Sequence, residues 1–316
     1  MDLFITTFES VAVLLGIGVI GFLIIKRKII PAELLSNLSP LALDIALPSL
    51  VFINIIQDFD PNLYPEWWQM PLWWCFFTVI AAGLTFVFMF FSKKENRKEF
   101  AISLFYQNGI FFPLAVLAGM YGSDSPYVSL LFLFTIFYAA FFFSTYQFFF
   151  KSEEKISINW RKIIHPVLIA TVIAIFINQF GFKSYVPEVV ISILVLLGGM
   201  TIPLLMLILG GNVYNDYKKT GEIELFEIMK FVLVKNFVFP ILMIIILFFL
   251  KDILSYPVAL ILLLQAAVPP VTAVPLVVER AGGNRSIVNQ FLVGSFVISL
   301  VSIPLMIYIF GLYFSV

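Results

Sequence analysis

The 316 residues are 61% hydrophobic and 12% charged, with a mean hydropathy of +1.05, a composition that excludes a soluble protein with a polar surface. Nineteen Lys and Arg balance nineteen Asp and Glu, so the net charge indicates no nucleic-acid partner. Cys75 is the only cysteine and His165 the only histidine, which excludes an internal disulfide and a multi-histidine metal site. The composition predicts an all-α polytopic membrane protein, for which we expect no metal and no cofactor.

The first element is expected to be a retained membrane helix, because Asp2 and Glu9 stand where a cleavable signal peptide carries basic residues. Windows of about 20 apolar residues, the length that spans a bilayer, recur along the chain. We expect ten membrane helices, at residues 5–25, 34–57, 69–91, 99–120, 127–150, 162–181, 187–211, 228–250, 255–279 and 287–314.

Basic residues concentrate in alternate loops between these windows. Most Lys and Arg residues lie in the loops of one side, whereas the loops of the other side hold only Lys183 and Lys251. Because cytoplasmic loops carry the excess of basic residues, we expect the basic side to be cytoplasmic and both termini to lie outside the cell membrane. A cluster of tryptophans then predicts an aromatic belt at the outer interface: Trp67, Trp68, Trp73 and Trp74.

The two halves of the chain resemble each other at an offset of about 155–160 residues. The stretch PAELLSNLSPLALDIALPSLVFINI aligns with PEVVISILVLLGGMTIPLLMLILGG, and LFYQNGIFFPLAVLAGMYG aligns with LLLQAAVPPVTAVPLVVERAGG. The second alignment places Gln107 on Gln265. Five helices per half is an odd number, so residues 1–150 and 151–316 are expected to form two inverted repeats.

Proline and glycine interrupt one apolar window in each half. The interrupting residues are Pro269, Pro270 and Pro275 in the ninth window, and Asn108, Gly109 and Pro113 in the fourth. A proline lacks a backbone N–H and obstructs the helix, and unpaired backbone at membrane depth is tolerated where it is buried in protein or lines a wet cavity. A single proline would indicate a kink satisfied by neighbouring helices. Interruptions in both halves favour a secondary transporter with its site at the midplane of the membrane.

At these residues the chain resembles the auxin efflux carrier family. QAAVPPVTAVP is similar to the ninth-helix crossover of that family. QNGIFFPLAVLAGMYG is similar to its fourth-helix crossover, where an asparagine stands thirteen residues before the tyrosine of a Tyr-Gly pair, as Asn108 does before Tyr121. The short loop KSEEKISINWRK replaces the long cytoplasmic loop of many plant members. The resemblance covers all ten expected helices and is to a compact microbial carrier of organic acids such as malate or malonate.

The resemblance implies an elevator-type carrier that exports an organic anion and is not an enzyme, with a fold like that of sodium/proton antiporters and bile-acid transporters. In the family, helices 1, 2, 6 and 7 form a dimerising scaffold, helices 3–5 and 8–10 form a moving transport domain, and the substrate carboxylate lies near the crossed helices 4 and 9. Asn108 would donate to that carboxylate. The residues expected to contact the substrate are Gln107, Asn108, Gly109, Lys235, Gln265, Pro269, Pro270 and Thr272.

Two charged residues inside expected helices leave two interpretations each. Asp44 lies near the centre of the second helix, where a carboxylate is costly and too short to reach the interface. It either couples a cation or proton to transport or is a hydrogen-bonded structural acid. Lys235 lies about 5 residues into the eighth helix, roughly 7 Å by helical rise. It either attracts an anionic substrate or extends its ammonium to the interface.

The sequence lacks the motifs that are typical of other function classes. The chain has no HExxH, no GxSxG and no P-loop sequence. GIGVIG matches a dinucleotide-binding pattern, but no strand precedes it, so we expect a glycine face for close packing of membrane helices.

A sodium- or proton-coupled organic anion symporter and a membrane sensor stay open as alternatives. The partners expected are a small organic anion, membrane lipid and a second copy of the chain.

Overall fold

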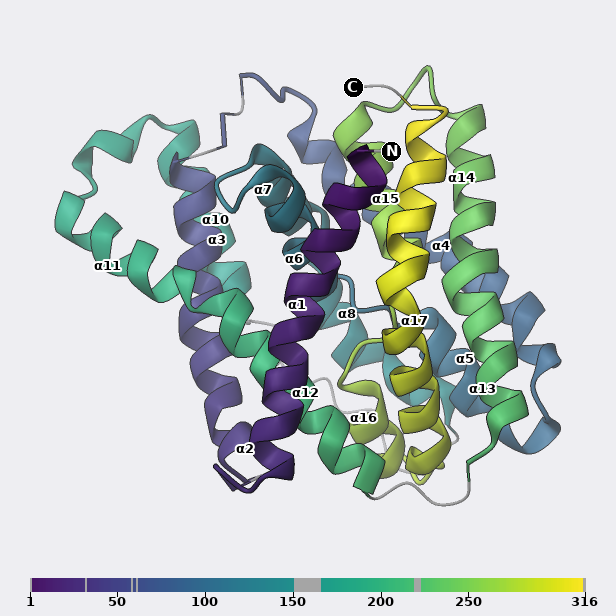
Figure 1. Cartoon of the computed structure of the whole chain (residues 1–316). Coiled ribbons are helices and arrows are strands. Elements are labelled where there is room, and N and C mark those ends of the chain that lie inside the picture. Colours follow the sequence, from purple (N-terminus) through teal and green to yellow (C-terminus); the bar gives the residue numbers. More distant parts are fainter. Residues whose placement is uncertain are drawn as a thin grey trace.

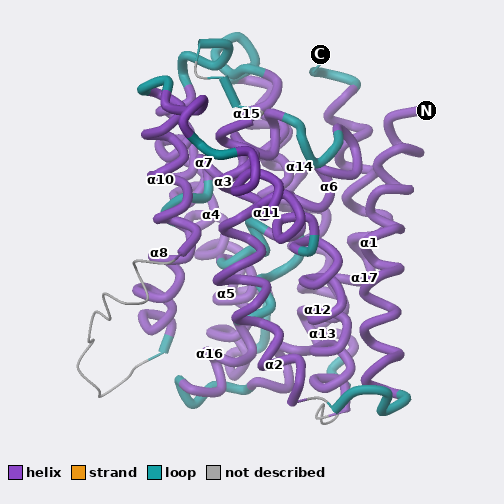
Figure 2. Tube along the Cα trace, turned by 90° about the vertical axis from the view of Figure 1, so that its left-hand side faces the viewer, coloured by secondary structure: helices purple, strands orange, loops and turns teal. Residues whose placement is uncertain are grey.

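The computed structural model of the chain describes residues 2–31, 33–57, 59–60, 62–150, 166–218 and 223–314. His165 and the basic loop before it lie outside the described residues. The described part is built of helices, turns and loops, and it holds an isolated β-bridge but no β-strand (Figure 2). Both chain ends lie at the same end of the molecule (Figure 1). That placement fits an even number of membrane crossings.

The first half of the chain contains α1 (Asp2–Lys26), α2 (Glu33–Pro40), α3 (Leu47–Gln57), α4 (Met70–Phe88), α5 (Arg97–Phe105), α6 (Phe111–Tyr121), α7 (Pro126–Phe134) and α8 (Tyr138–Thr145). The second half contains α10 (Pro166–Gln179), α11 (Glu188–Gly199), α12 (Thr201–Lys218), α13 (Leu225–Val232), α14 (Phe239–Phe249), α15 (Tyr256–Ala267), α16 (Val274–Arg280) and α17 (Arg285–Gly311).

Within the described residues, six helical segments are long and apolar enough to cross a bilayer: Thr7–Lys26, Asn37–Gln57, Trp67–Phe91, Glu188–Asn215, Leu225–Phe249 and Arg285–Gly311. Three shorter apolar helices, Phe111–Tyr121, Pro166–Gln179 and Tyr256–Ala267, lie between them. These helices identify a polytopic integral membrane protein. The full count of ten crossings stays a prediction.

Two of the long segments contain a wider turn just before a proline. Leu41–Ala46 is a π-helical turn before Pro48, and Leu233–Val238 is one before Pro240. The residue after each turn donates its N–H to a carbonyl five residues back. Proline has no N–H to give to the carbonyl four residues before it, and the wider turn redistributes the remaining bonds. The windows 34–57 and 228–250 are therefore each two α-helices joined by a π turn.

Helices α1 and α12 approach each other through glycine. A Cβ atom added at Gly21 would collide with the backbone of Leu207, and one added at Gly210 would collide with the backbone of Gly18. A Cβ at Gly16 would meet nothing within 4 Å. Small residues allow membrane helices to pack backbone against backbone. The expected close-packing glycine face is therefore confirmed at Gly21, whereas a Cβ at Gly18 would lie at an ordinary contact distance of 3.8 Å from the Met206 carbonyl.

The helices pack in two groups. In the first group α1 packs against α12, and α3 packs against α10 and α11 (Figure 1). In the second group α4 packs against α5, α7 and α15, and α17 packs against α5, α13, α15 and α16. The groups meet where α1 contacts α17 and α6, and where α3 contacts α7. The principal contacts of α4, α13 and α14 all lie inside the second group, so these helices form its far side.

Asp60 and Lys94 are expected to lie on opposite sides of the membrane, because basic residues gather in the loop that holds Lys94. Single cysteines at the two positions, in a Cys75→Ala background, should react with a membrane-impermeant maleimide from outside and from inside respectively. The native Cys75 is exposed and must be removed first. Labelling of both cysteines from one side would contradict the topology.

Candidate functional site

The interruptions of the fourth and ninth expected helices meet in space. Residues 106–110 separate α5 from α6, and residues 268–273 separate α15 from α16. The two segments, which we call the crossing, are joined by an antiparallel bridge between Gln107 and Pro270. Two backbone hydrogen bonds flank the bridge, from the N–H of Asn108 to the carbonyl of Pro269 at 2.8 Å and from the N–H of Val271 to the carbonyl of Tyr106 at 2.9 Å. Each break thus satisfies backbone groups of the other, as membrane depth requires.

The prolines divide into two kinds. Pro269 and Pro270 lie buried in the break itself. Pro113 and Pro275 instead lie in the first turns of α6 and α16, where a backbone N–H has no helical acceptor in any case. Pro113 and Pro275, which we expected to break the helices, therefore mark the points where the helices restart.

Two glutamines hold the crossing together. The Gln107 amide donates to the Gln265 side-chain oxygen at 3.2 Å, and the Gln265 amide donates to the Gly109 carbonyl at 2.8 Å. Gln265 is fully buried and Gln107 is 4% exposed. A Cβ added at Gly109 would lie 2.5 Å from the Gln265 oxygen, so the pair needs glycine there. The two glutamine side chains therefore hydrogen-bond within the protein, and these bonds position the crossing.

Asn108 differs from both glutamines. Its side chain is 2% exposed, and its Oδ1 has no hydrogen-bond partner among the described residues. Leaving a buried polar group unpaired costs about 1–3 kcal/mol, so such groups call for an explanation. Asn108 stands three residues before α6, whose first N–H groups have no intrahelical acceptor. Oδ1 is an acceptor and cannot bond to an anion, so the groups here that suit an anionic ligand are the Nδ2 donor of Asn108 and the N–H groups at the N-terminus of α6.

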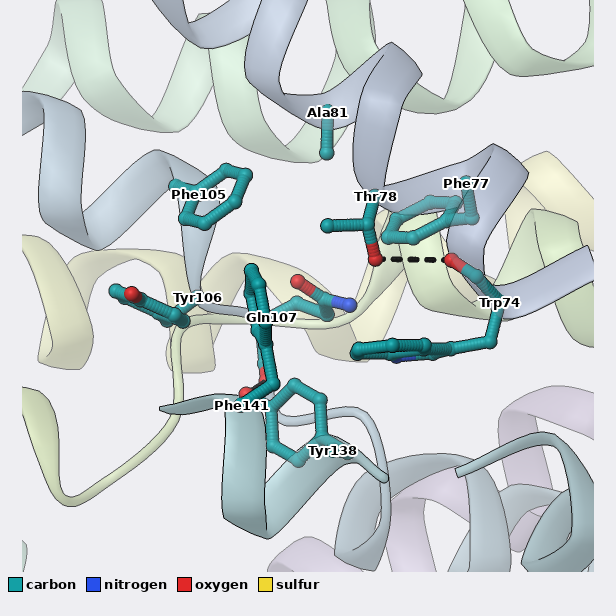
Figure 3. Close-up of a pocket in the computed structure, with 9 residues that line it drawn as sticks. All are labelled: Trp74, Phe77, Thr78, Ala81, Phe105, Tyr106, Gln107, Tyr138 and Phe141. Carbon is teal, nitrogen blue, oxygen red and sulfur yellow. Dashed lines mark hydrogen bonds between the residues drawn. The ribbon is translucent and has the colours of Figure 1, made fainter. Parts of the chain in front are cut away.

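The Gln107 side chain also borders a small cavity between α4, α8 and the crossing (Figure 3). The lining residues are Trp74, Phe77, Thr78, Ala81, Phe105, Tyr106, Gln107, Tyr138 and Phe141. The space open to a water molecule is about 10 Å³, which holds about one water. The cavity is therefore too small to hold an organic acid in this conformation.

Trp74 corrects the expected aromatic belt. It is only 6% exposed, because Phe141 of α8 packs edge-on against it with ring centroids 5.2 Å apart. Trp68 is 58% exposed, as an interfacial residue would be. Trp74 is thus part of the wall beside the crossing and not part of a belt.

Lys235 reaches the crossing from the far side of the second group. It lies on the π turn Leu233–Val238, ten residues after the start of α13 at Leu225, or roughly 15 Å by helical rise. Its side chain is 1% exposed, and its ammonium donates to the carbonyl of Ala266 at 3.3 Å. The ammonium therefore does not extend to the interface. The expected depth of about 5 residues was too shallow, because Lys235 already lies seven residues after the start of the window at 228 and α13 begins three residues earlier still.

The other two predicted residues lie differently. Thr272 belongs to the crossing and is half-buried. Asp44 lies on the π turn Leu41–Ala46 in the first group, is exposed, and has α10, α11 and α12 as the neighbours of its turn. Asp44 is thus separate from the crossing, which brings together Gln107, Asn108, Gly109, Lys235, Gln265, Pro269 and Pro270. Across the described residues, no cluster of three or more His, Cys, Asp or Glu is placed to hold a metal ion.

Two tyrosines at the crossing were not predicted. The Tyr138 hydroxyl of α8 donates to the Gln107 carbonyl, and the Tyr106 hydroxyl shares a 2.7 Å hydrogen bond with that of Thr145. Both tyrosines are buried. Residues 127–150 are rich in Phe and Tyr. The sequence therefore does not indicate which tyrosine of this stretch uses its hydroxyl in a hydrogen bond.

Comparison with known proteins adds two findings. A family profile described as a membrane transport protein matches residues 6–159 and, in a second match, residues 153–307. An uncharacterized transporter of Methanocaldococcus jannaschii is 26% identical over 219 residues, which is 67% of this chain and 71% of that protein. One profile match contains the break between α5 and α6, and the other contains the break between α15 and α16.

Proposed function

Because this chain belongs to the auxin efflux carrier family of membrane transport proteins, we propose that it exports a small organic anion by an elevator mechanism driven by the membrane potential. The substrate is a carboxylate such as malate or malonate, or an auxin-like acid. The protein acts as a transporter in the cell membrane and not as an enzyme.

The unpaired amide of Asn108 is the observation that carries this proposal. The side chains of Gln107 and Gln265 are bonded within the protein. The side chain of Asn108 makes no hydrogen bond among the described residues, although it is 2% exposed and stands just before α6. A carboxylate oxygen would accept from the Nδ2 of Asn108 and from the free N–H groups of the first turn of α6. In this arrangement Gln107, Gly109, Gln265, Pro269, Pro270 and Thr272 shape the site around Asn108.

The proposed moving parts follow the two packing groups. The first group, with α1, α3, α10, α11 and α12, would be the scaffold and the surface that pairs with a second copy. The second group, with α4–α8 and α13–α17, would carry the crossing across the membrane. The chain would be two inverted repeats, residues 1–150 and 151–316, with both termini outside. The close backbone contact between α1 and α12 supports placing both helices in the scaffold.

The membrane potential is sufficient to drive export of an anion. Moving one charge through 100 mV is worth about 2.3 kcal/mol, which supports roughly a 50-fold gradient of a monoanion. The interior of the cell is negative, so the potential pushes an anion outwards. No sodium or proton gradient is then required.

Proteoliposomes provide the test of this function. Vesicles loaded with a panel of radiolabelled carboxylates, including malate, malonate and indole-3-acetate, should release at least one of them faster when valinomycin imposes an inside-negative potential. Empty liposomes and the Asn108→Ala variant are the controls. Efflux that appears only with a sodium or proton gradient would favour the coupled symporter, and Asp44→Asn would then be expected to change that dependence. Absence of flux for the whole panel would favour a sensor.

A further inference from the structure

We infer that Asn289 of α17 is a second amide of the substrate site, where it binds the far carboxylate of a dicarboxylate. The inference rests on the proposed function and narrows the substrate class of that same site. Asn289 is 1% exposed, and its side chain, like that of Asn108, makes no hydrogen bond among the described residues. The protein thus holds two buried amides whose hydrogen-bonding groups lack a partner in the described chain, and such groups call for an explanation.

The first turn of α6 packs against the middle of α17. The rings of Phe112 and Phe296 meet edge-on, with centroids 5.4 Å apart. Residues 289 and 296 are seven apart, which is about two turns of an α-helix, so Asn289 and Phe296 lie on the same face of α17. Asn289 therefore lies on the face of α17 that is turned toward α6, roughly 10 Å before Phe296 along the helix.

Helices α6 and α17 run in the same direction. Tyr256, the first residue of α15, joins their far ends. Its hydroxyl shares a 3.3 Å hydrogen bond with that of Tyr121 in α6, and its ring centroid lies 5.6 Å from that of Phe310 in α17. Both helices thus lead from the contact of Phe112 with Phe296 toward this end. The segments that precede that contact in α6 and in α17 therefore also lie beside each other.

These two segments hold the two amides. Asn108 stands four residues before α6 residue 112, and Asn289 lies two turns before α17 residue 296. The connection through α16 gives a similar level. Helix α16 leads away from the crossing for seven residues, and α17 packs against it and returns in the opposite direction. Asn289 is the fifth residue of α17, so it lies about one turn, roughly 5 Å, from the level of the crossing.

This arrangement suits a short anion with a carboxylate at each end. One carboxylate would accept from Asn108 and the first turn of α6, and the other would accept from the Nδ2 of Asn289. Arg285 lies one turn before Asn289 on α17, and its positive charge favours a second negative charge there. A monocarboxylate would leave Asn289 unpaired, which lowers its affinity relative to a dicarboxylate. Both amides are nearly without solvent contact, so the site is closed in this conformation.

Thermal-shift titrations of the purified protein with malonate and with monomethyl malonate test this inference. The half ester has nearly the same length and carries one charge fewer, so the wild type should bind malonate more tightly. Asn289→Ala should lower the malonate affinity roughly 10- to 150-fold, the loss expected for a hydrogen bond to a charged group, and the half-ester affinity by less than about tenfold. Asn108→Ala should lower both affinities by similar factors, because both acids place a carboxylate there.

Ser299→Ala is the matched control on the same helix. Ser299 is 0% exposed, and its hydroxyl donates to the Phe296 carbonyl at 2.6 Å, within α17. Both affinities of this variant should equal those of the wild type. Should Asn289→Ala fail to fold, Asn289→Leu, which keeps the approximate volume of the side chain without its amide, takes its place. Should both fail, the preference of the wild type for malonate over the half ester decides.

Four results would separate the inference from the proposed function. An unchanged malonate affinity in Asn289→Ala, or equal losses for malonate and its half ester, would overturn the inference. Absence of a malonate preference in the wild type would overturn it as well. Binding of indole-3-acetate without binding of malonate or malate would also overturn it and leave the proposed function standing. Absence of binding and of flux for every carboxylate tested would instead overturn the proposed function.

Discussion

Asn108→Ala is expected to abolish transport while leaving the fold intact. The Asn108 side chain has no hydrogen-bond partner among the described residues, so its removal breaks no described side-chain bond. A hydrogen bond to a charged group contributes about 1.5–3 kcal/mol, so the affinity for a carboxylate should fall roughly 10- to 150-fold. Thermal-shift titrations with malate, malonate and indole-3-acetate measure the affinity, and the melting temperature without ligand measures the fold.

Asn236→Ala is the matched control for this prediction. Asn236 is fully buried, accepts from the Ser295 hydroxyl at 2.7 Å, and donates to the Ser295 carbonyl at 3.0 Å and to the Ser302 hydroxyl at 3.1 Å. Its removal leaves those groups unpaired and should cost about 1–3 kcal/mol of stability. The two asparagines should therefore separate binding from folding. Wild-type affinity in Asn108→Ala would remove Asn108 from the site.

Gly109→Ala is expected to reduce flux at least tenfold through the glutamine pair. The added methyl would lie 2.5 Å from the Gln265 side-chain oxygen, which must move and give up its bond with Gln107. The backbone of Gly109 is not left-handed, unlike that of Gly122, Gly181 and Gly282, so the effect is steric and not conformational. Overpacking of this kind costs about 1–3 kcal/mol. Flux and melting temperature should both fall.

Two comparisons make the Gly109 prediction specific. Gly83→Ala, in α4, places its methyl where nothing lies within 4 Å and should leave flux unchanged. In a Gln265→Ala background the overlap at Gly109 disappears, so adding Gly109→Ala should cost little further. Contacting residues give such non-additive effects, whereas independent sites add. Additive losses would show that Gly109 acts by some route other than Gln265.

The breaks at the crossing were predictable because proline and glycine act locally. Two adjacent prolines, Pro269 and Pro270, disfavour a continuous helix, and the structure places its two breaks at these prolines and at Asn108–Gly109. The prediction that the two breaks lie together in space came from the family resemblance. Spacing alone does not determine which segments touch.

The roles of individual polar residues were harder to predict. Gln107, Gln265 and Asn108 are all amides inside apolar windows, and only the family resemblance singled out Asn108 as the donor to the substrate. The structure separates them because Gln265 reaches Gly109 and Gln107, whereas Asn108 reaches no partner in the described chain. The position of Lys235 was equally hard to predict. Whether its ammonium reaches the interface or stays inside depends on where the helix begins, and the sequence does not determine that residue closely. Both π turns escaped prediction as well, because a proline also fits a simple kink.

The glycine contact between α1 and α12 bears on how the protein assembles. At roughly 5–20 residues per second, the ribosome reaches Gly210 on the order of 10–40 s after Gly21. During that time the glycine face of α1 lacks the partner helix that it contacts in the finished structure. The first half of the chain therefore cannot complete its packing when its synthesis ends, although the sequence repeats at that point. Assembly of α1 waits for a helix of the second half, and the two halves fold as one unit.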